Sequence, residues 1–478
     1  MILQDTICAT STAQGVGALG IIRVSGKDAI SISNEIFKGK DLTKVDSHTV
    51  HYGFIVRNSQ FEVRSLQSEH PTSSIQHPTS DIQPEVIDEV MVSVFKAPKT
   101  FTAEDLVEIS CHGSPYIQQQ IIALLIENGA RLALPGEFTQ RAFLNGRIDL
   151  SQAEAVADLI AAENKASHDI ALNQMRGGIF SELQVLREQL INFTALIELE
   201  LDFSEEDVEF ANRKELEELI QNLKIKIQNL LKTFEYGNAI KNGVPVAIIG
   251  KPNAGKSTLL NALLNEERAI VSDIPGTTRD TIEETMTIDG ITFRFIDTAG
   301  IRETQDMIEA IGVEKAREKV NSAKIVIHLY EDDLEILEKL GGVLQDKIVF
   351  SLRSKIDKSE GVEFQFNEDF PNFHQFGISV KTGLNLEKLK EELVLQLRSA
   401  TGVDENTVII SNIRHKEALQ NAFDALENVE SGMRMGLTGD LLAFHLRETL
   451  KYIGSITGQI DVDKDILGTI FGKFCIGK

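Results

Sequence analysis

The stretch Gly250-Lys251-Pro252-Asn253-Ala254-Gly255-Lys256-Ser257 decides how the rest of this 478-residue chain is interpreted. It follows an apolar, β-rich run at 244–249 and leads into a helical pattern that begins at Ser257. In this strand–loop–helix context, glycines let backbone N–H groups turn toward phosphate oxygens, and the helix N-terminus adds positive charge. Lys256 is expected to reach the β- and γ-phosphates, and the Ser257 hydroxyl to bind Mg²⁺. The flanking elements disfavour the alternative, a glycine-rich turn without a ligand.

Composition narrows the classes of protein that fit. The length suits two to four domains, and 42% of the residues are hydrophobic. No apolar run approaches the eighteen residues of a membrane span, and the first residues lack a signal-peptide layout, so no membrane partner is expected. Three distant cysteines fit neither a disulfide framework nor a zinc site and favour the cytoplasm. A net charge of -24 means that RNA contact would need a local basic patch or a basic partner.

Residues 1–145 have the mixed pattern of an α+β domain. The apolar strand at 18–24 contains Arg23, which could form an edge-strand salt bridge or bind an anion in a cavity; the pattern alone favours the salt bridge. A heptapeptide at 70–76 recurs at 77–83 and is interpreted as a loop insertion, since it cannot bury a core. Strand character resumes at 86–95, and Glu108 places a carboxylate within another apolar run.

Helical patterning begins at about 146. Ser151-Gln152-Ala153-Glu154 is interpreted as a capping box, and the acidic stretch 205–209 as a solvated surface. One apolar helical face runs from 216 to 234, with members at 216, 219, 220, 223, 227, 230, 231 and 234. Core packing explains that face.

Strands and helices alternate over 241–398, which predicts a doubly wound, mostly parallel sheet that binds a nucleotide at its carboxyl edge. Asp289-Gly290 predicts a hairpin, and further strands are expected at 324–330 and 347–352. Helical patterning returns over 399–478. The nucleotide domain is therefore expected to be inserted into a helical domain, whose halves are 146–240 and 399–478.

Four guanine-nucleotide motifs follow one another in order. Gly276-Thr277-Thr278-Arg279 suits a switch loop whose threonine, Thr278, completes the Mg²⁺ shell, and Asp297-Thr298-Ala299-Gly300 suits the next motif. Ser354-Lys355-Ile356-Asp357 and Ser379-Val380-Lys381 suit recognition of the base, although Ser354 stands where asparagine is usual. The expected nucleotide contacts are Asn253, Ala254, Gly255, Lys256, Ser257, Thr258, Ser272, Asp273, Ile274, Pro275, Gly276, Thr277, Thr278, Asp297, Thr298, Ala299, Gly300, Ser354, Lys355, Asp357, Ser379, Val380 and Lys381.

Two catalytic groups of Ras-like enzymes are missing from these motifs. Ile301 follows the second motif where a water-orienting glutamine would stand, and no arginine is clearly placed as a finger, although Arg279 and Arg302 are near. Hydrolysis therefore needs another water-positioning group and another positive charge beside the transferred phosphoryl group.

The motifs, together with Pro135-Gly136-Glu137-Phe138-Thr139-Gln140-Arg141 and the terminal Cys475-Ile476-Gly477-Lys478, resemble the MnmE (TrmE) family of tRNA-modification GTPases nearly end to end. The resemblance implies that K⁺ replaces the arginine finger, held by positions that match Asn253, Ser272, Ile274 and Thr277. It also implies that Glu309, in Glu309-Ala310-Ile311-Gly312, orients the water. A charge at a helix N-terminus is the other reading of Glu309. Two nucleotide domains would meet in a homodimer when GTP binds.

The family's N-terminal domain dimerises and binds a tetrahydrofolate derivative, 5-formyl- or 5,10-methylene-tetrahydrofolate. Its contacts match Arg23, Glu108, Arg147 and Lys478, with Arg147 in place of an expected lysine. The resemblance implies a GTPase that works with an FAD-containing MnmG-type partner, as a heterotetramer, to modify C5 of the wobble uridine of tRNA. Two alternatives stay open: a regulatory or ribosome-assembly GTPase without folate chemistry, and a folate-binding scaffold that has lost hydrolysis.

Overall fold

The computed structural model describes residues 5–57, 85–202, 212–265, 284–296, 309–331, 334–358, 373–401 and 407–458. The chain divides into two compact units, 1–157 with 457–478, and 158–456. The predicted loop insertion at 70–83 and the acidic stretch at 205–209 lie outside the described residues. The domain boundaries expected near 145, 240 and 398 stay predictions.

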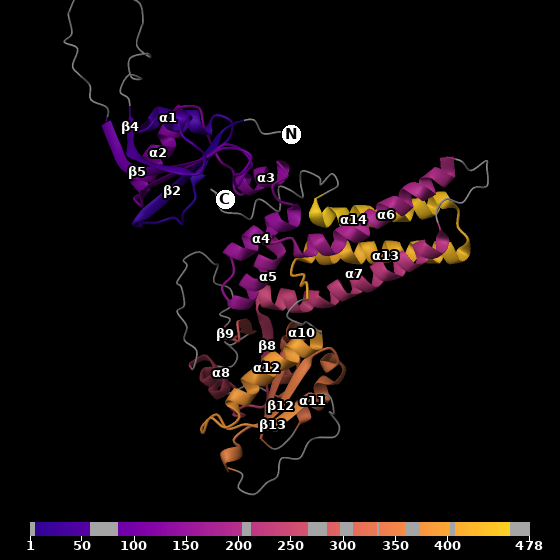
Figure 1. The fold of residues 1–478 in the computed structure, drawn as a ribbon. Coiled ribbons are helices and arrows are strands. Elements are labelled where there is room, and N and C mark those ends of the chain that lie inside the picture. Colours follow the sequence, from indigo (N-terminus) through magenta and orange to yellow (C-terminus); the bar gives the residue numbers. More distant parts are fainter. Residues whose placement is uncertain are drawn as a thin grey trace, which may run out of the picture. The chain divides into compact units, whose positions relative to one another are not determined.

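A seven-stranded sheet forms the first unit, in the order β3-β4-β5-β6-β2-β1-β7. Its pairs are antiparallel except for β1 with β7. The strands are β1 (Ile7–Thr10), β2 (Leu19–Ser25), β3 (Phe37–Lys38), β4 (Thr49–Arg57), β5 (Glu85–Phe95), β6 (Leu106–His112) and β7 (Arg131–Leu132). The helices are α1 (Ala29–Ile36), α2 (Pro115–Glu127), α3 (Glu137–Leu144) and most of α4 (Leu150–Ile160), which the boundary after Ala157 divides; Figure 1 labels all four.

Apolar side chains of α1 and α2 close the core of this sheet, among them Ile32 and Leu125, which pack with Val92 and Ile109. The alternation of buried and more exposed residues along β5 gives this strand one core face. Burial raises the pKa of the free Cys8 thiol, which lies in this core, to about 11.

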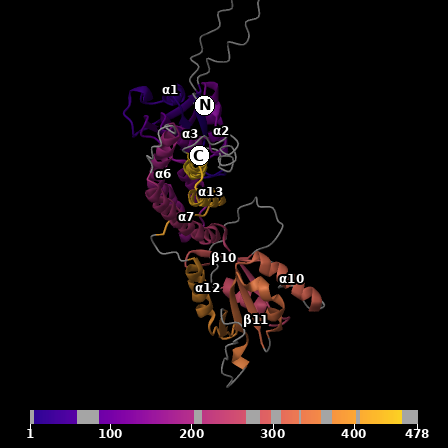
Figure 2. The ribbon, with the colours of Figure 1, turned by 90° about the vertical axis from the view of Figure 1, so that its right-hand side faces the viewer.

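The helical part of the second unit contains α5 (Lys165–Met175), α6 (Gly178–Asp202), α7 (Arg213–Asn242), α13 (Ile413–Met435) and α14 (Gly439–Thr457). One apolar cluster takes residues from both sides of the nucleotide-binding segment: α6 and α7 contribute Leu190 and Leu223, and α13 and α14 contribute Leu426 and Leu446. This shared core confirms that the segment is inserted into a helical domain. Figure 2 shows α6, α7 and α13 side by side.

The predicted face of α7 is confirmed, because Leu216, Leu219, Ile220, Leu223, Ile227, Leu230 and Phe234 are buried and Leu231 packs against them. The predicted capping box at 151–154 is wrong. The α4 helix already begins at Leu150, so the carboxylate of Asp149 caps it, accepting from the Gln152 amide at 2.9 Å while Gln152 Oε1 accepts from the Asp149 amide.

The nucleotide-binding sheet has the order β13-β12-β11-β8-β10-β9, and only the β9–β10 pair is antiparallel. Its strands are β8 (Val244–Ile249), β9 (Glu284–Ile288), β10 (Ile291–Phe295), β11 (Ile325–Tyr330), β12 (Ile348–Arg353) and β13 (His374–Gly377). Asp289 and Gly290 turn β9 into β10 with φ values of 49° and 77°, as predicted for this dipeptide. The helices are α8 (Lys256–Asn265), α10 (Glu309–Ser322), α11 (Glu335–Leu340) and α12 (Leu386–Thr401).

Helices cover both faces of this sheet, which confirms the doubly wound fold. Leu259 of α8 and Leu389 of α12 belong to one core cluster, and Val320 of α10 and Leu337 of α11 belong to another. Short 3₁₀ turns occur at Leu42–Lys44, Gly341–Leu344 and Ile356–Lys358. No helix among the described residues is both long and apolar enough to span a membrane.

Candidate functional site

The phosphate loop turns where β8 ends, and its backbone requires glycine. Gly250 has a φ of +147°, and a Cβ there would lie 2.2 Å from the carbonyl oxygen of Leu329 on β11. Gly255 has a φ of +98°, a conformation that other residues rarely adopt. Asn253 is an exposed residue of the loop, and its backbone has the left-handed conformation with a φ of +64°. These turns bring the chain into α8, whose first residues can bind phosphate with their free N–H groups.

Lys256 lies across this loop. Its ammonium group donates hydrogen bonds to the carbonyl oxygens of Gly250 at 2.8 Å and Lys251 at 2.7 Å. Burial and the nearby positive charge of Lys319 lower the pKa of Lys256. A bound phosphate would oppose that effect, so the lysine is set to exchange carbonyl partners for phosphate oxygens. Ser257 and Thr258 lie in the first turn of α8, where a hydroxyl can reach a phosphate-bound Mg²⁺.

The loop expected to recognise the base follows β12. The carboxylate of Asp357 accepts a hydrogen bond from Ser379 Oγ at 2.7 Å, and this bond holds the pKa of Asp357 below its ordinary value. Ser379 is fully buried and also accepts from the Thr382 amide at 3.4 Å. Val380 packs against the core, and Lys381 is exposed. Asp357 is thereby kept ionised and oriented as an acceptor for the N–H groups of guanine.

Lys355 joins this base loop to the phosphate loop. Its ammonium group donates to the carbonyl oxygen of Asn253 at 2.7 Å and forms an ion pair with Glu331, just beyond β11. Ser354, by contrast, is 7% exposed, and its hydroxyl has no hydrogen-bond partner within the described part of the chain. Sequence reasoning missed Glu331, because nothing in its local pattern indicates which cation it meets.

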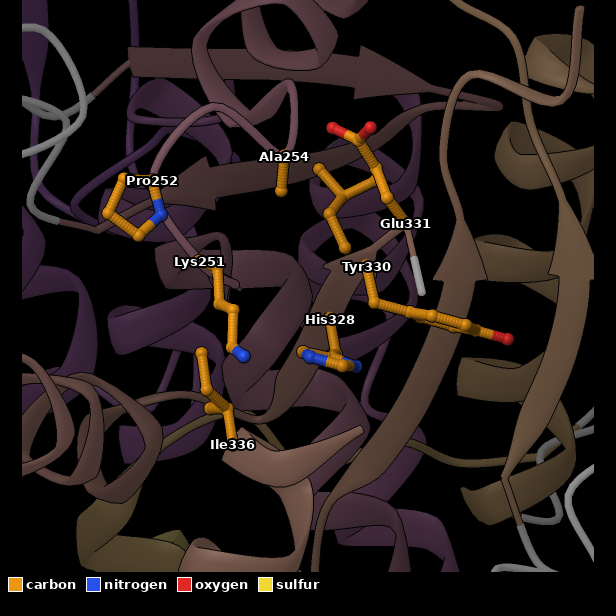
Figure 3. Close-up of a pocket in the computed structure, with 8 residues that line it drawn as sticks. Lys251, Pro252, Ala254, His328, Tyr330, Glu331 and Ile336 are labelled. Atoms are coloured by element: carbon orange, nitrogen blue, oxygen red, sulfur yellow. The ribbon is translucent and has the colours of Figure 1, made fainter. Parts of the chain in front are cut away.

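A cavity of about 170 Å³ lies beside the phosphate loop, between Lys251 and Pro252 on one side and His328 and Tyr330 of β11 on the other. The rings of His328 and Tyr330 stack with their centroids 5.6 Å apart. In Figure 3 the carboxylate of Glu331 lies toward Ala254 and away from the His328 ring. The phosphate loop and the end of β11 thus face each other across this space.

Several expected site residues lie outside the described part of the chain: Ser272, Asp273, Ile274, Pro275, Gly276, Thr277, Thr278, Asp297, Thr298, Ala299, Gly300 and Lys478. Glu309 is the first residue of α10, but only its backbone belongs to the described part of the structure. The roles assigned to these residues stay predictions.

A second cavity, of about 520 Å³, lies in the first unit and brings together residues expected to contact folate. Glu108 and Arg147 both line it, with aromatic walls from Phe95 and Phe101. Arg23 donates from Nε and Nη2 to Glu108 Oε1, at 3.0 and 2.7 Å. The salt bridge expected for Arg23 is confirmed. Its expected place on an edge strand is wrong, because β2 lies between β6 and β1.

Charge and aromatic surface are combined around Arg23. Its guanidinium lies 5.3 Å from the centre of the Phe101 ring and 5.7 Å from that of Phe138. Both hydrogen bonds to Glu108 go to one oxygen, which leaves the other able to accept from a ligand. The cavity therefore offers a carboxylate acceptor that Arg23 holds in place, the cation of Arg147 and aromatic walls to a flat, polar ligand with an anionic tail.

Phosphate-binding amides, a bridging lysine and an oriented aspartate at the carboxyl edge of a parallel sheet define a P-loop protein that binds guanine nucleotides. Two family models match: that of the MnmE helical domain over residues 150–475, and that of the GTP-binding protein TrmE N-terminus over residues 6–147.

Curated relatives match along their whole length. A protein of Flavobacterium johnsoniae named tRNA modification GTPase MnmE is 48% identical over 493 residues, with 100% of both chains covered. A Bacteroides fragilis protein of the same name is 49% identical, with 99% of this chain and 100% of the relative covered. The G domain of the T. maritima FeoB iron transporter is 28% identical over 32% of this chain and 97% of its own, with a TM-score of 0.24. This chain belongs to the MnmE (TrmE) family, and it is a GTP hydrolase.

Proposed function

We propose that this protein is a potassium-stimulated GTPase of tRNA modification. With an FAD-containing MnmG-type partner, it would build an aminomethyl or carboxymethylaminomethyl group on C5 of the wobble uridine, using a one-carbon unit carried by tetrahydrofolate. Its own N-terminal domain would bind the folate, and its nucleotide domains would meet in a homodimer when GTP binds. The name of the relatives, tRNA modification GTPase MnmE, supports the tRNA substrate.

The observation that carries the folate part of this proposal is the cavity of about 520 Å³ in the first unit. Its volume is in the range of small-molecule sites. Glu108 can accept the amide-like N–H groups of a pterin ring, Phe101 offers an aromatic wall, and Arg147 can attract the glutamate tail. A regulatory GTPase without folate chemistry has no use for this combination, which is why we favour the first reading over that alternative.

Hydrolysis requires positive charge beside the transferred phosphoryl group, and we infer that K⁺ supplies it at Asn253. That residue is exposed in the phosphate loop, and Lys355 holds its carbonyl oxygen in place. The K⁺ ligand would be the side-chain amide oxygen of Asn253, a suitable donor atom for a hard cation, and the hydrogen bond from Lys355 restrains the backbone that carries it. Ser272, Ile274 and Thr277 would complete the site.

Single-turnover GTP hydrolysis in K⁺, in Na⁺ and without a monovalent ion tests the potassium proposal. We expect hydrolysis at least about tenfold faster in K⁺, since loss of one charge-stabilising group in other enzymes costs that much or more. Ionic strength is matched with a bulky organic cation, which separates specific binding from screening. Equal rates in all three solutions would exclude K⁺ from the mechanism.

Binding of 5-formyl-tetrahydrofolate tests the cavity. A Glu108→Gln substitution keeps the side-chain shape but removes the charge that pairs with Arg23 and accepts from the pterin. We expect affinity, measured by isothermal titration calorimetry, to fall about tenfold, because the substitution removes one member of a partly buried charge pair that faces the ligand.

The matched control for this measurement is Glu127→Gln, an exposed carboxylate at the end of α2 that does not line the cavity. Its folate affinity should equal that of the unchanged chain. Unaltered affinity in Glu108→Gln would place the folate elsewhere and would revive the alternative of a regulatory GTPase.

A further inference from the structure

Glu331 occupies a junction between three parts of the nucleotide site. It follows the last residue of β11, and its carboxylate forms an ion pair with Lys355 of the base loop. Its carbonyl oxygen accepts from Arg353 Nε at 3.2 Å, at the end of the neighbouring strand β12. The Lys355 ammonium donates at the same time to the carbonyl oxygen of Asn253 in the phosphate loop. One cation therefore connects the sheet edge, the base loop and the phosphate loop.

Both loops have a left-handed backbone at the point that Lys355 connects, and this conformation is the less favourable one at Lys355 itself. Lys355 and Asn253 are left-handed, with φ values of 58° and 64°, although neither is glycine. Such backbones persist when surrounding contacts over-determine them. The hydrogen bond from Lys355 to the carbonyl of Asn253 joins one left-handed residue to the other, and Glu331 fixes the ammonium group that makes this bond.

The first residue of the base loop contributes no such restraint. The Ser354 hydroxyl is buried without a hydrogen-bond partner within the described residues, so its side chain makes no hydrogen bond to the phosphate loop there. Asp357 is held by Ser379, which belongs to the other base loop and not to the phosphate loop. Among the described contacts, the one side-chain link between the base loop and the phosphate loop runs through Lys355.

We propose that Glu331 is a positioning residue for the nucleotide. It acts through Lys355, and it couples the grip on the guanine base to the conformation of the phosphate loop at Asn253. Without the Glu331 carboxylate, the Lys355 side chain loses an ion-pair partner, and its ammonium group rotates away from the Asn253 carbonyl oxygen more readily. Both loops then sample more conformations, and bound nucleotide dissociates faster. The part of this proposal that concerns K⁺ rests on the proposed function, in which Asn253 is a ligand of the ion.

The test is a double-substitution cycle on the release of fluorescently labelled GDP, measured by stopped flow in Glu331→Gln, Lys355→Met and the doubly substituted protein. We expect Glu331→Gln to speed release about two- to fivefold, the scale of a partly exposed ion pair, and Lys355→Met to speed it more. The double substitution should match Lys355→Met alone, because Glu331 acts only through that lysine. The proposal would be overturned if the rate increases of the two single variants multiplied in the double variant. It would also be overturned if Glu331→Gln released GDP at the unchanged rate.

Two further measurements separate this role from general destabilisation. Glu338→Gln, an exposed carboxylate on the adjacent helix α11, serves as the matched control and should leave GDP release unchanged. Circular dichroism melting should be the same for Glu331→Gln and Glu338→Gln, since both side chains reach solvent. Faster release in Glu338→Gln as well would trace the effect to loss of negative charge near the site and not to the contact with Lys355.

The K⁺ concentration that gives half of the maximal rate of GTP hydrolysis, here called the potassium midpoint, extends the test to Asn253. In Glu331→Gln we expect this midpoint to rise about two- to fivefold at saturating GTP, because a looser Asn253 is a poorer ligand. One outcome is that GTP hydrolysis by the unchanged chain does not depend on K⁺, while the GDP release rates of the three variants agree with the double-substitution cycle. In that case the potassium proposal fails and the role of Glu331 stands. If the unchanged chain responds to K⁺ but its midpoint in Glu331→Gln does not move, the coupling to Asn253 is wrong.

Discussion

GTP hydrolysis by a Glu309→Ala variant is expected to be about a hundredfold slower than in the unchanged chain, with GTP affinity nearly intact, the scale of losing one positioned acid–base group. The carboxylate would hold the attacking water in line with the phosphoryl group, a role that Ile301 cannot take. Glu309 begins α10, and Lys319 of the same helix is near enough to lower the pKa of Lys256. Val320 of this helix packs in one core cluster with Ile249, the last residue of β8, so α10 lies against the strand that leads into the phosphate loop.

The competing role for Glu309 is favourable interaction with the dipole at the N-terminus of α10, and it predicts a different result. Loss of that interaction would cost about 0.3–1 kcal/mol of stability and leave the chemical step untouched. Glu309→Gln separates the two roles further, because its amide can still hydrogen-bond water and should recover part of the rate.

Rapid-quench single-turnover hydrolysis in saturating K⁺ is the measurement, with GTP affinity determined separately by titration. Glu318→Ala, an exposed glutamate within the same helix, controls for loss of an acidic side chain from α10. Hydrolysis at the normal rate in Glu309→Ala would remove this residue from the mechanism. The water would then have to be oriented by another group.

Local rules predicted the elements of the nucleotide domain well. Gly250 and Gly255 have the positive φ values that a phosphate loop needs, and Asp289-Gly290 makes the expected hairpin. The apolar face of α7 is buried as its 3.6-residue period indicates. These features succeed because the physics that fixes them acts within a few residues of sequence.

Local patterns failed where two signals compete or where the partner is distant. At α4, Asp149 and Ser151 could each cap a helix, and the earlier residue does so. The contacts of Lys355 with Asn253 and Glu331 join residues 102 and 24 positions apart. Composition gives no sign of such pairs, because they depend on which strand ends meet in the folded sheet. For the folate residues the match was to a family motif, and only the fold shows that Arg23 meets Glu108.

An Arg141→Met variant is expected to lose about 3–5 kcal/mol of stability in the first unit, the cost of removing one partner from a buried ionic cluster. The Arg141 side chain is 2% exposed. It donates to the Asp5 carboxylate at 2.7 Å, to Glu104 at 3.2 Å and to Glu137 at 3.0 Å. Methionine fills similar space without charge, so Glu137, itself 1% exposed, would lose a cation in the interior.

Hydrogen exchange measured by mass spectrometry on peptides from β1 and α3 reports the stability of this region by itself. Arg131→Met is the matched control, because Arg131 also pairs with Asp5 and Glu137 but its side chain is 39% exposed. Screening by water should limit its loss to about 1 kcal/mol. Equal losses in the two variants would show that burial does not set the strength of this cluster.

The pH dependence of the Arg141→Met effect follows from Glu137. Burial alone would raise the pKa of Glu137, but hydrogen bonds from Arg131, the Leu134 amide and Arg141 outweigh it and hold the pKa below its ordinary value of 4.5. A carboxyl group with a depressed pKa stabilises the fold above its unfolded-state pKa and loses that contribution as the pH falls through the folded-state value. The gap in stability between Arg141→Met and the unchanged chain should therefore be full at pH 7 and shrink below about pH 4.5, where Glu137 can take up a proton and no longer needs a cation. A gap that stays constant across this range would assign the loss to packing and not to charge.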